Sequence, residues 1–140
     1  MLFSKKYLEP TFTFDIVGMS YQKKEIESIA ILNPEYDYSD AQLNDLSREK
    51  VYRYIWSINS IKLVPEPKNK ADKNAIMVVI NGAKVGYVPS DKTDVVKNYL
   101  KRKISLSCSL HGGKWKEAYF GKYERKEYSY YGTITINLLS

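Results

Sequence analysis

The feature that most constrains this chain is a two-strand pattern around one tight turn. Residues 75–81 (AIMVVIN) and 84–88 (KVGYV) are rich in β-branched side chains, and Asn81 and Gly82 lie where the two segments meet. Asn-Gly is the strongest short-range signal for a two-residue hairpin, because both turn positions need a positive φ. An antiparallel hairpin over residues 75–88 therefore anchors the predicted fold.

Short strands and helices are predicted on the N-terminal side of this hairpin. Residues 11–19 (TFTFDIVGM) read as a strand, and residues 21–32 have the spacing of a short amphipathic helix that ends at Asn33-Pro34. Ser39 stands three residues before Gln42, which is the spacing of a capping box at the start of a brief helix to about Arg48. Residues 51–67 are too long for one flat strand, so we expect a bent strand, bulged near Asn59 and Ser60.

On the C-terminal side the pattern predicts one more helix and two more strands. Ser90 or Asp91 caps a helix over residues 93–101, and residues 104–110 alternate as a strand. Gly112 and Gly113 are expected to turn the chain into a Lys-, Tyr- and Glu-rich excursion, before residues 132–139 form a closing strand. Five or six antiparallel strands with two or three short helices predict an α+β fold, mainly β, arranged as a small barrel.

Composition limits the class of protein. The 140 residues fit one domain, and we find no internal repeat or linker. The single cysteine, Cys108, excludes an internal disulfide and a zinc site of several thiolates. Lys5 and Lys6 are followed by no apolar stretch of signal-peptide length, and no run of 18 apolar residues occurs. We therefore expect a soluble, cytoplasmic protein that does not enter a membrane.

The charge favours a polyanionic partner. Lysine and arginine number 22 against 16 acidic residues, which gives a net charge of +6 and a pI near 9.2. The 13 tyrosines, many beside cations, could stack on bases while the cations hold phosphates. Tyrosine is also an ordinary residue of amphipathic strands, so both interpretations stay open.

Residues 61–91 (IKLVPEPKNKADKNAIMVVINGAKVGYVPSD) carry a more specific pattern, which resembles the HIRAN domain family. An opening motif of that family also occurs, as Val17, Gly18 and Tyr21. The resemblance covers roughly residues 12–110, with an extra segment at about 33–57, and the excursion at about 112–131 lies outside it. The matching positions in the main motif are Glu66, Pro67, Asn69, Asp72, Asn74, Ala75, Ile76, Val78, Gly82, Val85, Gly86, Tyr87, Val88 and Pro89.

The resemblance implies a single, six-stranded, OB-like antiparallel β-barrel that binds DNA, of the kind found as free-standing bacterial or phage proteins. In family members that capture the 3′ end of single-stranded DNA, a stacking aromatic matches Tyr21 and a carboxylate that meets the terminal hydroxyl matches Asp72. Three other pocket positions depart: Ser20 and Ser90 stand where cations are expected, and Ala71 stands where a tyrosine is expected.

These patterns lead to a predicted function and site. We expect a DNA-binding module, for single-stranded DNA or DNA ends, in DNA repair, replication or a mobile-element process. The alternative is a protein-interaction module or phage-type inhibitor that reuses the barrel and binds through the extra segment or the excursion. The residues predicted to contact DNA are Tyr21, Lys68, Lys70, Asp72, Lys73, Tyr87 and Trp115. Asp72 has an equally ordinary structural interpretation as a turn cap, and Gly86 is expected where two backbones approach closely.

The sequence contains few candidate catalytic or metal-binding residues. Cys108 and His111 are separated by three positions and would face opposite sides of a continuing strand, so a catalytic dyad is not expected. The acidic residues Glu35, Asp37 and Asp40 could hold Mg²⁺, but solvated acids and helix caps are commoner beside a helix start. We expect no enzyme activity, no cofactor and no metal.

Overall fold

The structure is a computed structural model that describes residues 7–139. Lys5 and Lys6, the two lysines considered above as the start of a signal peptide, lie outside the described residues. No helix over residues 7–139 is both long enough and apolar enough to span a membrane.

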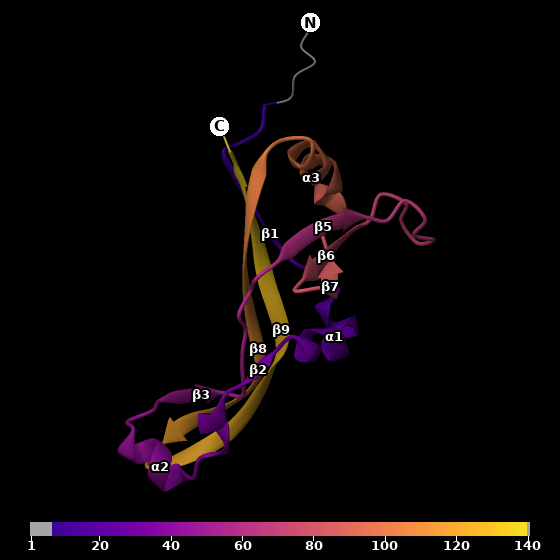
Figure 1. Ribbon diagram of the computed structural model, residues 1–140. Helices are drawn as coiled ribbons and strands as arrows, with labels where there is room; N and C mark the ends of the chain where they lie inside the picture. The colour runs from indigo at the N-terminus through magenta and orange to yellow at the C-terminus, as the bar shows by residue number, and fades with distance from the viewer. Residues whose placement is uncertain (1–6, 140) are drawn as a thin grey trace, which may run out of the picture.

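One long antiparallel hairpin runs through the molecule (Figure 1). Its strands are β8 (Ile104–Tyr119) and β9 (Lys122–Leu138), joined by a turn at Phe120 and Gly121, which both have positive φ. Strand β1 (Thr11–Asp15) pairs with residues 133–137 near the C-terminal end of β9, and β3 (Lys50–Tyr52) pairs with residues 115–117 near the C-terminal end of β8. The sheet order is therefore β1-β9-β8-β3.

The predicted turn at Gly112-Gly113 is wrong. Both glycines lie inside β8, at a bulge between His111 and Gly113 where the register with β9 shifts. Their φ values are 102° and 86°, and a Cβ on Gly112 would lie 2.4 Å from the carbonyl oxygen of Ser129. The pair thus serves a bulge, where the strand must bend and the backbones come close. The excursion at 112–131 is the far end of the hairpin.

The Asn81-Gly82 hairpin is confirmed. Strands β5 (Ile61–Pro65), β6 (Ile76–Ile80) and β7 (Ala83–Tyr87) form a three-stranded sheet, and Asn81 and Gly82 have φ of 49° and 83°. The expected bulge near Asn59 and Ser60 is an interruption instead, because β4 (Tyr54–Ile55) and β5 are separate strands. The Asn81 carboxamide holds this break, since its Oδ1 accepts from the N–H groups of Asn59 and Ser60 at 2.8 and 3.0 Å.

The helices are shorter than the sequence patterns predict. Three are α-helices, α1 (Lys23–Ser28), α2 (Asp40–Asp45) and α3 (Thr93–Leu100), and three are 3-10 turns, η1 (Met19–Tyr21), η2 (Pro34–Asp37) and η3 (Ser90–Lys92). After α1 the chain forms the two-residue strand β2 (Ile31–Leu32), which pairs with β4.

Of the two predicted helix starts, one is confirmed. Ser39 and Gln42 make the reciprocal capping box of α2, at 3.2 and 2.9 Å. The expected cap by Ser90 or Asp91 is wrong, because both residues belong to η3 and α3 begins without a side-chain cap. The η3 turn reaches the start of α3 directly, so no single residue has to supply the cap.

The expected closed six-stranded barrel is wrong, although the fold is α+β and mainly β with antiparallel sheets. The strands form three separate sheets of four, three and two strands, and no ladder joins β5 to β8. The main core fills the space between the four-stranded and three-stranded sheets and α3. It is built by Phe14, Ile16, Met19, Ile26, Leu63, Ile76, Val78, Ile80, Val85, Val88, Val96, Tyr99, Leu110, Ile134 and Ile136.

The segments 33–57 and 112–131, which the resemblance seen in the sequence does not cover, pack on each other. We call them together the accessory lobe, which is the end of the molecule that holds α2 and β3 in Figure 1. Lys116 on β8 is only 6% exposed, donates to the Tyr38 carbonyl at 3.1 Å and lies 5.2 Å from the Tyr36 ring centre. Two fully buried apolar side chains of the lobe, Leu43 and Val51, lie outside the main core.

Candidate nucleic-acid interface

The loop between β5 and β6, residues 66–75, is held in shape by its own polar side chains. Asn69 Oδ1 accepts from the N–H groups of Ala71 and Asp72 at 2.9 and 3.0 Å, and Asn69 Nδ2 donates to Glu66 Oε1 at 3.0 Å. Asp72 Oδ1 accepts from the Asn74 N–H at 2.8 Å. These are the local bonds by which Asn and Asp favour turns. The loop therefore presents a fixed backbone.

Three predicted cations project from this loop. Lys68, Lys70 and Lys73 are all exposed, and none forms an ion pair with another of the residues 7–139. A hollow of about 540 Å³ lies beside them, lined by residues 66–71 and Tyr87. Cations that have no protein partner are free to contact phosphates.

Tyr87, on β7, ties the loop to the three-stranded sheet. Its hydroxyl donates to Glu66 Oε1 at 2.7 Å and accepts from Lys84 Nζ, which also lies 4.4 Å from the ring centre. The hydrogen bond from Tyr87 is the main cause that lowers the pKa of Glu66, followed by that from Asn69. The bond with Tyr87 likewise raises the pKa of Lys84. One face of the Tyr87 ring is thus already covered by a cation.

Tyr21 offers a freer ring on the neighbouring turn. Val17 pairs with Tyr87 through two backbone hydrogen bonds of 2.9 Å, and the next residue, Gly18, enters η1 in a left-handed conformation. Tyr21 ends that turn and is 87% exposed. The expectation for Gly86 is confirmed, since a Cβ there would lie 2.5 Å from the Val17 carbonyl oxygen. Tyr87 therefore links the turn of Tyr21 to the loop of the three lysines.

Asp72 shows the structural role that the sequence left open. Its Oδ1 caps the turn at Asn74, while Oδ2 takes no hydrogen bond from residues 7–139. Ser20, Ala71 and Ser90, where the resemblance leads one to expect two cations and a tyrosine, are all exposed. Lys68 and Lys70 line one hollow with Tyr87, Asp72 and Lys73 lie in the same loop, and Tyr21 lies on the turn that follows the Val17–Tyr87 pair. Contact of these six residues with DNA stays a prediction.

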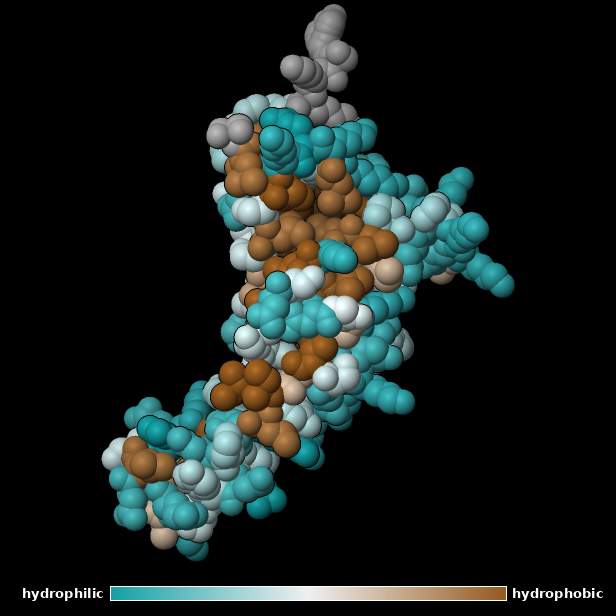
Figure 2. Space-filling view, viewed as in Figure 1, coloured by the Kyte–Doolittle hydropathy of each residue, from teal (hydrophilic) through white to brown (hydrophobic). Residues whose placement is uncertain are grey.

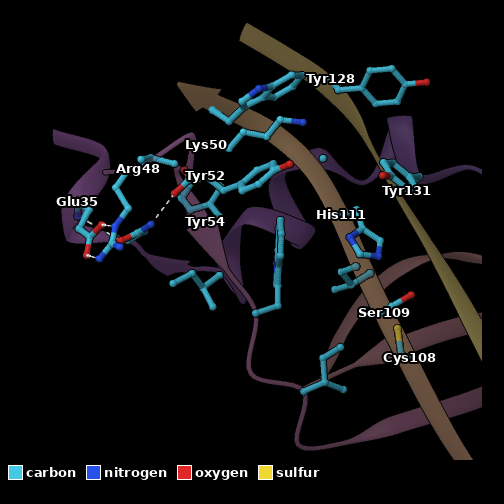
Figure 3. A pocket seen from close by; sticks show the side chains of 18 residues that line it. Glu35, Arg48, Lys50, Tyr52, Tyr54, Cys108, Ser109, His111, Tyr128 and Tyr131 are labelled. Carbon is cyan, nitrogen blue, oxygen red and sulfur yellow. Dashed lines mark hydrogen bonds and ion pairs between the residues drawn. The ribbon is translucent and has the colours of Figure 1, made fainter. Parts of the chain in front are cut away.

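The seventh, Trp115, lies apart from the others in the accessory lobe. It lines a groove of about 960 Å³ between β3, β4 and the middle of β8 and β9. Figure 3 shows Tyr52 and Tyr54 on one side of this groove and His111 and Tyr131 on the other. Sequence reasoning missed this groove, although the spacing of Tyr52, Tyr54 and Trp56 at every second position indicates one aromatic face of an extended chain.

The charges that border the aromatic groove are paired. Arg48 makes two hydrogen bonds to Glu35, at 2.6 and 3.0 Å, which lower the pKa of the carboxyl group. Glu117 pairs with Lys126 at 3.0 Å and with Lys50 at 3.6 Å. Glu35 is therefore engaged by a guanidinium, and over residues 7–139 no three His, Cys, Asp or Glu side chains gather as metal ligands.

Cys108 is a poor nucleophile in this environment. Burial raises the pKa of its thiol to about 11, so the reactive thiolate is scarce at neutral pH. The His111 ring stacks on Tyr131, with 5.1 Å between ring centres, and no hydrogen bond joins His111 to the thiol.

Comparison with known proteins agrees with the motif. The model of the HIRAN domain matches residues 11–111, which is more than half of the chain. No curated protein matches, and no solved structure matches. The match includes the loop of residues 66–75, Tyr21 and Tyr87, while most of the far end of the hairpin lies beyond it. The chain belongs to the HIRAN domain family.

Proposed function

We propose that this protein binds single-stranded DNA or DNA ends through a surface made by Tyr21, Asp72 and the three loop lysines Lys68, Lys70 and Lys73. The observation that carries the proposal is the set of unpaired, exposed lysines on a rigid loop within the HIRAN match. The HIRAN domain is generally a DNA-binding module, which supports DNA as the partner.

Each group has a distinct role in this proposal. The exposed Tyr21 ring stacks on a base, which is worth about 1 to 3 kcal/mol. The lysines contact phosphates. The free Oδ2 of Asp72 accepts a hydrogen bond from a terminal 3′ hydroxyl, and its charge repels a phosphate at that position. Tyr87 holds the loop and turn in place.

The charge distribution supports the same surface. Segment 33–57 carries five acidic and three basic residues, and segment 112–131 carries three acidic and five basic residues, so the accessory lobe has no net charge. The whole excess of +6 therefore belongs to the rest of the chain, which attracts a polyanion. We infer a binding module in the cytoplasm that serves repair, replication or a mobile element.

Fluorescence anisotropy tests the proposal with three labelled oligonucleotides: a single strand with a free 3′ hydroxyl, the same strand with a 3′ phosphate, and a duplex. We expect the single strands to bind and the free hydroxyl to be preferred. Changing Lys68, Lys70 and Lys73 together to glutamine should reduce the slope of log affinity against log salt concentration by about 2 in magnitude. Each phosphate contact contributes about 0.7 to this slope on single strands.

A matched pair of variants tests the stacking ring. Tyr21→Ala should weaken binding more than about tenfold, whereas Tyr119→Ala, which removes another exposed ring at the hairpin tip, should leave it unchanged. If both variants bind like the wild type, Tyr21 does not contact DNA. Absence of binding to all three oligonucleotides at low salt would refute the proposed function.

A further inference from the structure

The N-terminal half of β8 is hydrogen-bonded to another strand along one edge only. Residues 104–111 pair with β9, while β3 joins the other edge of β8 only at Trp115, Lys116 and Glu117. The next strand on that open side is β5, and no ladder connects the two. We call the space between β5 and residues 104–110 of β8 the seam. An open strand edge of this length can pair with another extended chain.

The direction of the backbone groups along the seam follows from the register. Leu139 donates its N–H to the Lys103 carbonyl, so odd-numbered residues of β8 face β9 in this stretch. Because successive residues of a strand alternate, the N–H and C=O groups of Ile104, Leu106, Cys108 and Leu110 point into the seam. None of these four residues makes a backbone hydrogen bond to a loop or turn of the described chain.

A continuous groove accompanies this edge. A hollow of about 300 Å³ at the upper end is lined by residues 58–61, Ile104 and Leu106. It meets the aromatic groove of the accessory lobe at Ile58, which lines both. Figure 2 shows apolar surface gathered on the same face, between α3 and the middle of the hairpin. An extended chain on β8 would lay alternate side chains over this apolar floor.

The two ends of the groove differ in charge. Lys101, Arg102 and Lys103 precede β8 directly, are exposed, and form no ion pair within residues 7–139. At the aromatic end the cations Arg48 and Lys50 are paired with carboxylates, and the lobe has no net charge. A polyanion would gain little from the aromatic end, whereas a peptide with one acidic end and one apolar end complements both.

The aromatic end also holds an unused donor. Trp56, which lines the groove, carries the one buried side-chain nitrogen or oxygen of residues 7–139 that lacks a hydrogen-bond partner, its Nε1. Buried donors are normally paired, and a peptide carbonyl group is a suitable acceptor.

We propose that the open edge of β8 captures an extended peptide segment of a partner protein as an added antiparallel strand. Antiparallel pairing is the more stable arrangement. It directs the C-terminal, acidic end of the peptide toward Lys101, Arg102 and Lys103, and an aromatic or other apolar side chain near its N-terminal end into the groove of the accessory lobe. This strand addition is independent of DNA binding at Tyr21 and Asp72.

The first test uses a fluorescent ten-residue probe with tryptophan near its N-terminus, alternating threonine and valine in the middle, and three glutamates at its C-terminus. Two matched probes replace the middle valines by prolines or the glutamates by glutamines. The first probe, called the acidic probe, should bind at least about tenfold more tightly than the probe with prolines, called the proline probe, because proline cannot donate to a strand ladder. The probe with glutamines is called the glutamine probe. Equal binding of these two probes, or no binding of either, overturns the proposal.

Variants of the protein locate the probe. Leu106→Pro removes an N–H that faces the seam, and Leu106→Ala removes the same apolar contacts but keeps that N–H. We expect about a tenfold loss for the proline variant and less than about a threefold change for the alanine variant. If Leu106→Pro does not fold, the joint change of Lys101, Arg102 and Lys103 to glutamine tests the proposal instead. This variant should bind the acidic probe more weakly than the wild type does and should bind the glutamine probe with unchanged affinity.

A competition experiment separates this proposal from DNA binding. Unlabelled oligothymidine should leave the bound probe in place, and Leu106→Pro should bind oligothymidine like the wild type. Displacement of the probe by oligothymidine, together with loss of oligothymidine binding in Leu106→Pro, would make the seam a DNA groove and overturn the peptide proposal. Failure of all oligonucleotides to bind would affect only the proposed DNA function.

Discussion

Substitution of one buried leucine should open the accessory lobe while the main core stays folded. Leu43 and Val51 are 0% and 3% exposed and are the fully buried apolar side chains of the lobe outside the main core. Full burial of such a side chain contributes about 1.5 to 3 kcal/mol. Leu43→Ala removes about half of that contribution and leaves a cavity, for a total cost of about 2 to 5 kcal/mol. A lobe with so small a core should then unfold locally.

Native-state hydrogen exchange with mass spectrometry measures this opening segment by segment. In Leu43→Ala, peptides that contain α2 and β3 should exchange at least about thirtyfold faster, which corresponds to about 2 kcal/mol. Peptides from β6 and β7 should keep their wild-type rates. Ile136→Ala is the matched control, since Ile136 is equally buried but belongs to the main core, and it should accelerate exchange throughout.

Independent opening of the lobe is refuted if Leu43→Ala accelerates hydrogen exchange in β6 and β7 as much as in α2 and β3, or lowers the urea midpoint of the main transition as much as Ile136→Ala does. The lobe and the main core would then be one cooperative unit, and the long hairpin would transmit the loss from one to the other.

Three further predictions concern single residues. Gly86→Ala should cost about 1 to 3 kcal/mol of unfolding free energy in urea titrations, because the new methyl group meets the Val17 carbonyl oxygen. Gly82→Asn should cost less, because a Cβ there meets nothing within 4 Å and asparagine tolerates the positive φ better than other side chains. The pKa of Glu66 is lowered in the folded state, so its stabilising contribution is complete above an unfolded pKa of about 4.3 and is lost as pH falls through the folded value; Glu66→Gln should lose less stability than the wild type below about pH 4 in acid titrations. With its pKa raised to about 11, Cys108 should react with a disulfide reagent at pH 8 about a hundredfold more slowly than free cysteine; a rate like that of free cysteine would contradict its burial.

Local signals in the sequence predicted the elements whose partners are sequence neighbours. Asn81-Gly82 needs only two positive φ values, and the capping box of Ser39 and Gln42 closes within one turn, so both are confirmed. Gly112-Gly113 has the same composition as a turn, but its role depends on Ser129 across the hairpin. Whether a glycine pair turns a chain or bulges a strand is decided by a partner that the local sequence does not contain.

The same difference between local signals and contacts with distant segments explains why the barrel prediction was wrong and why the aromatic groove was missed. Closure of a barrel depends on whether β5 meets β8, and no local pattern near Ile61 or Ile104 decides that contact. The family motif with fixed spacing points to Tyr21 and Asp72, and the charge of the same loop points to the lysines; the contact of these residues with DNA stays a prediction. The aromatic groove could not be predicted, because Tyr52 and Trp115 come from segments that lie far apart in the chain, with their rings 6.0 Å apart in the fold.

In each segment of the accessory lobe, most residues lie between the two members of a cross-strand pair. Leu32 lies opposite Tyr54 in the β2–β4 ladder, and His111 lies opposite Tyr131 in the long hairpin. A tight turn built across each pair would close the chain at both places without rerouting any other strand. The lobe is therefore a cassette that two excisions remove together, and excision of one segment alone would strip the other of its packing partner. An engineered minimal version of this fold should lose both segments or keep both.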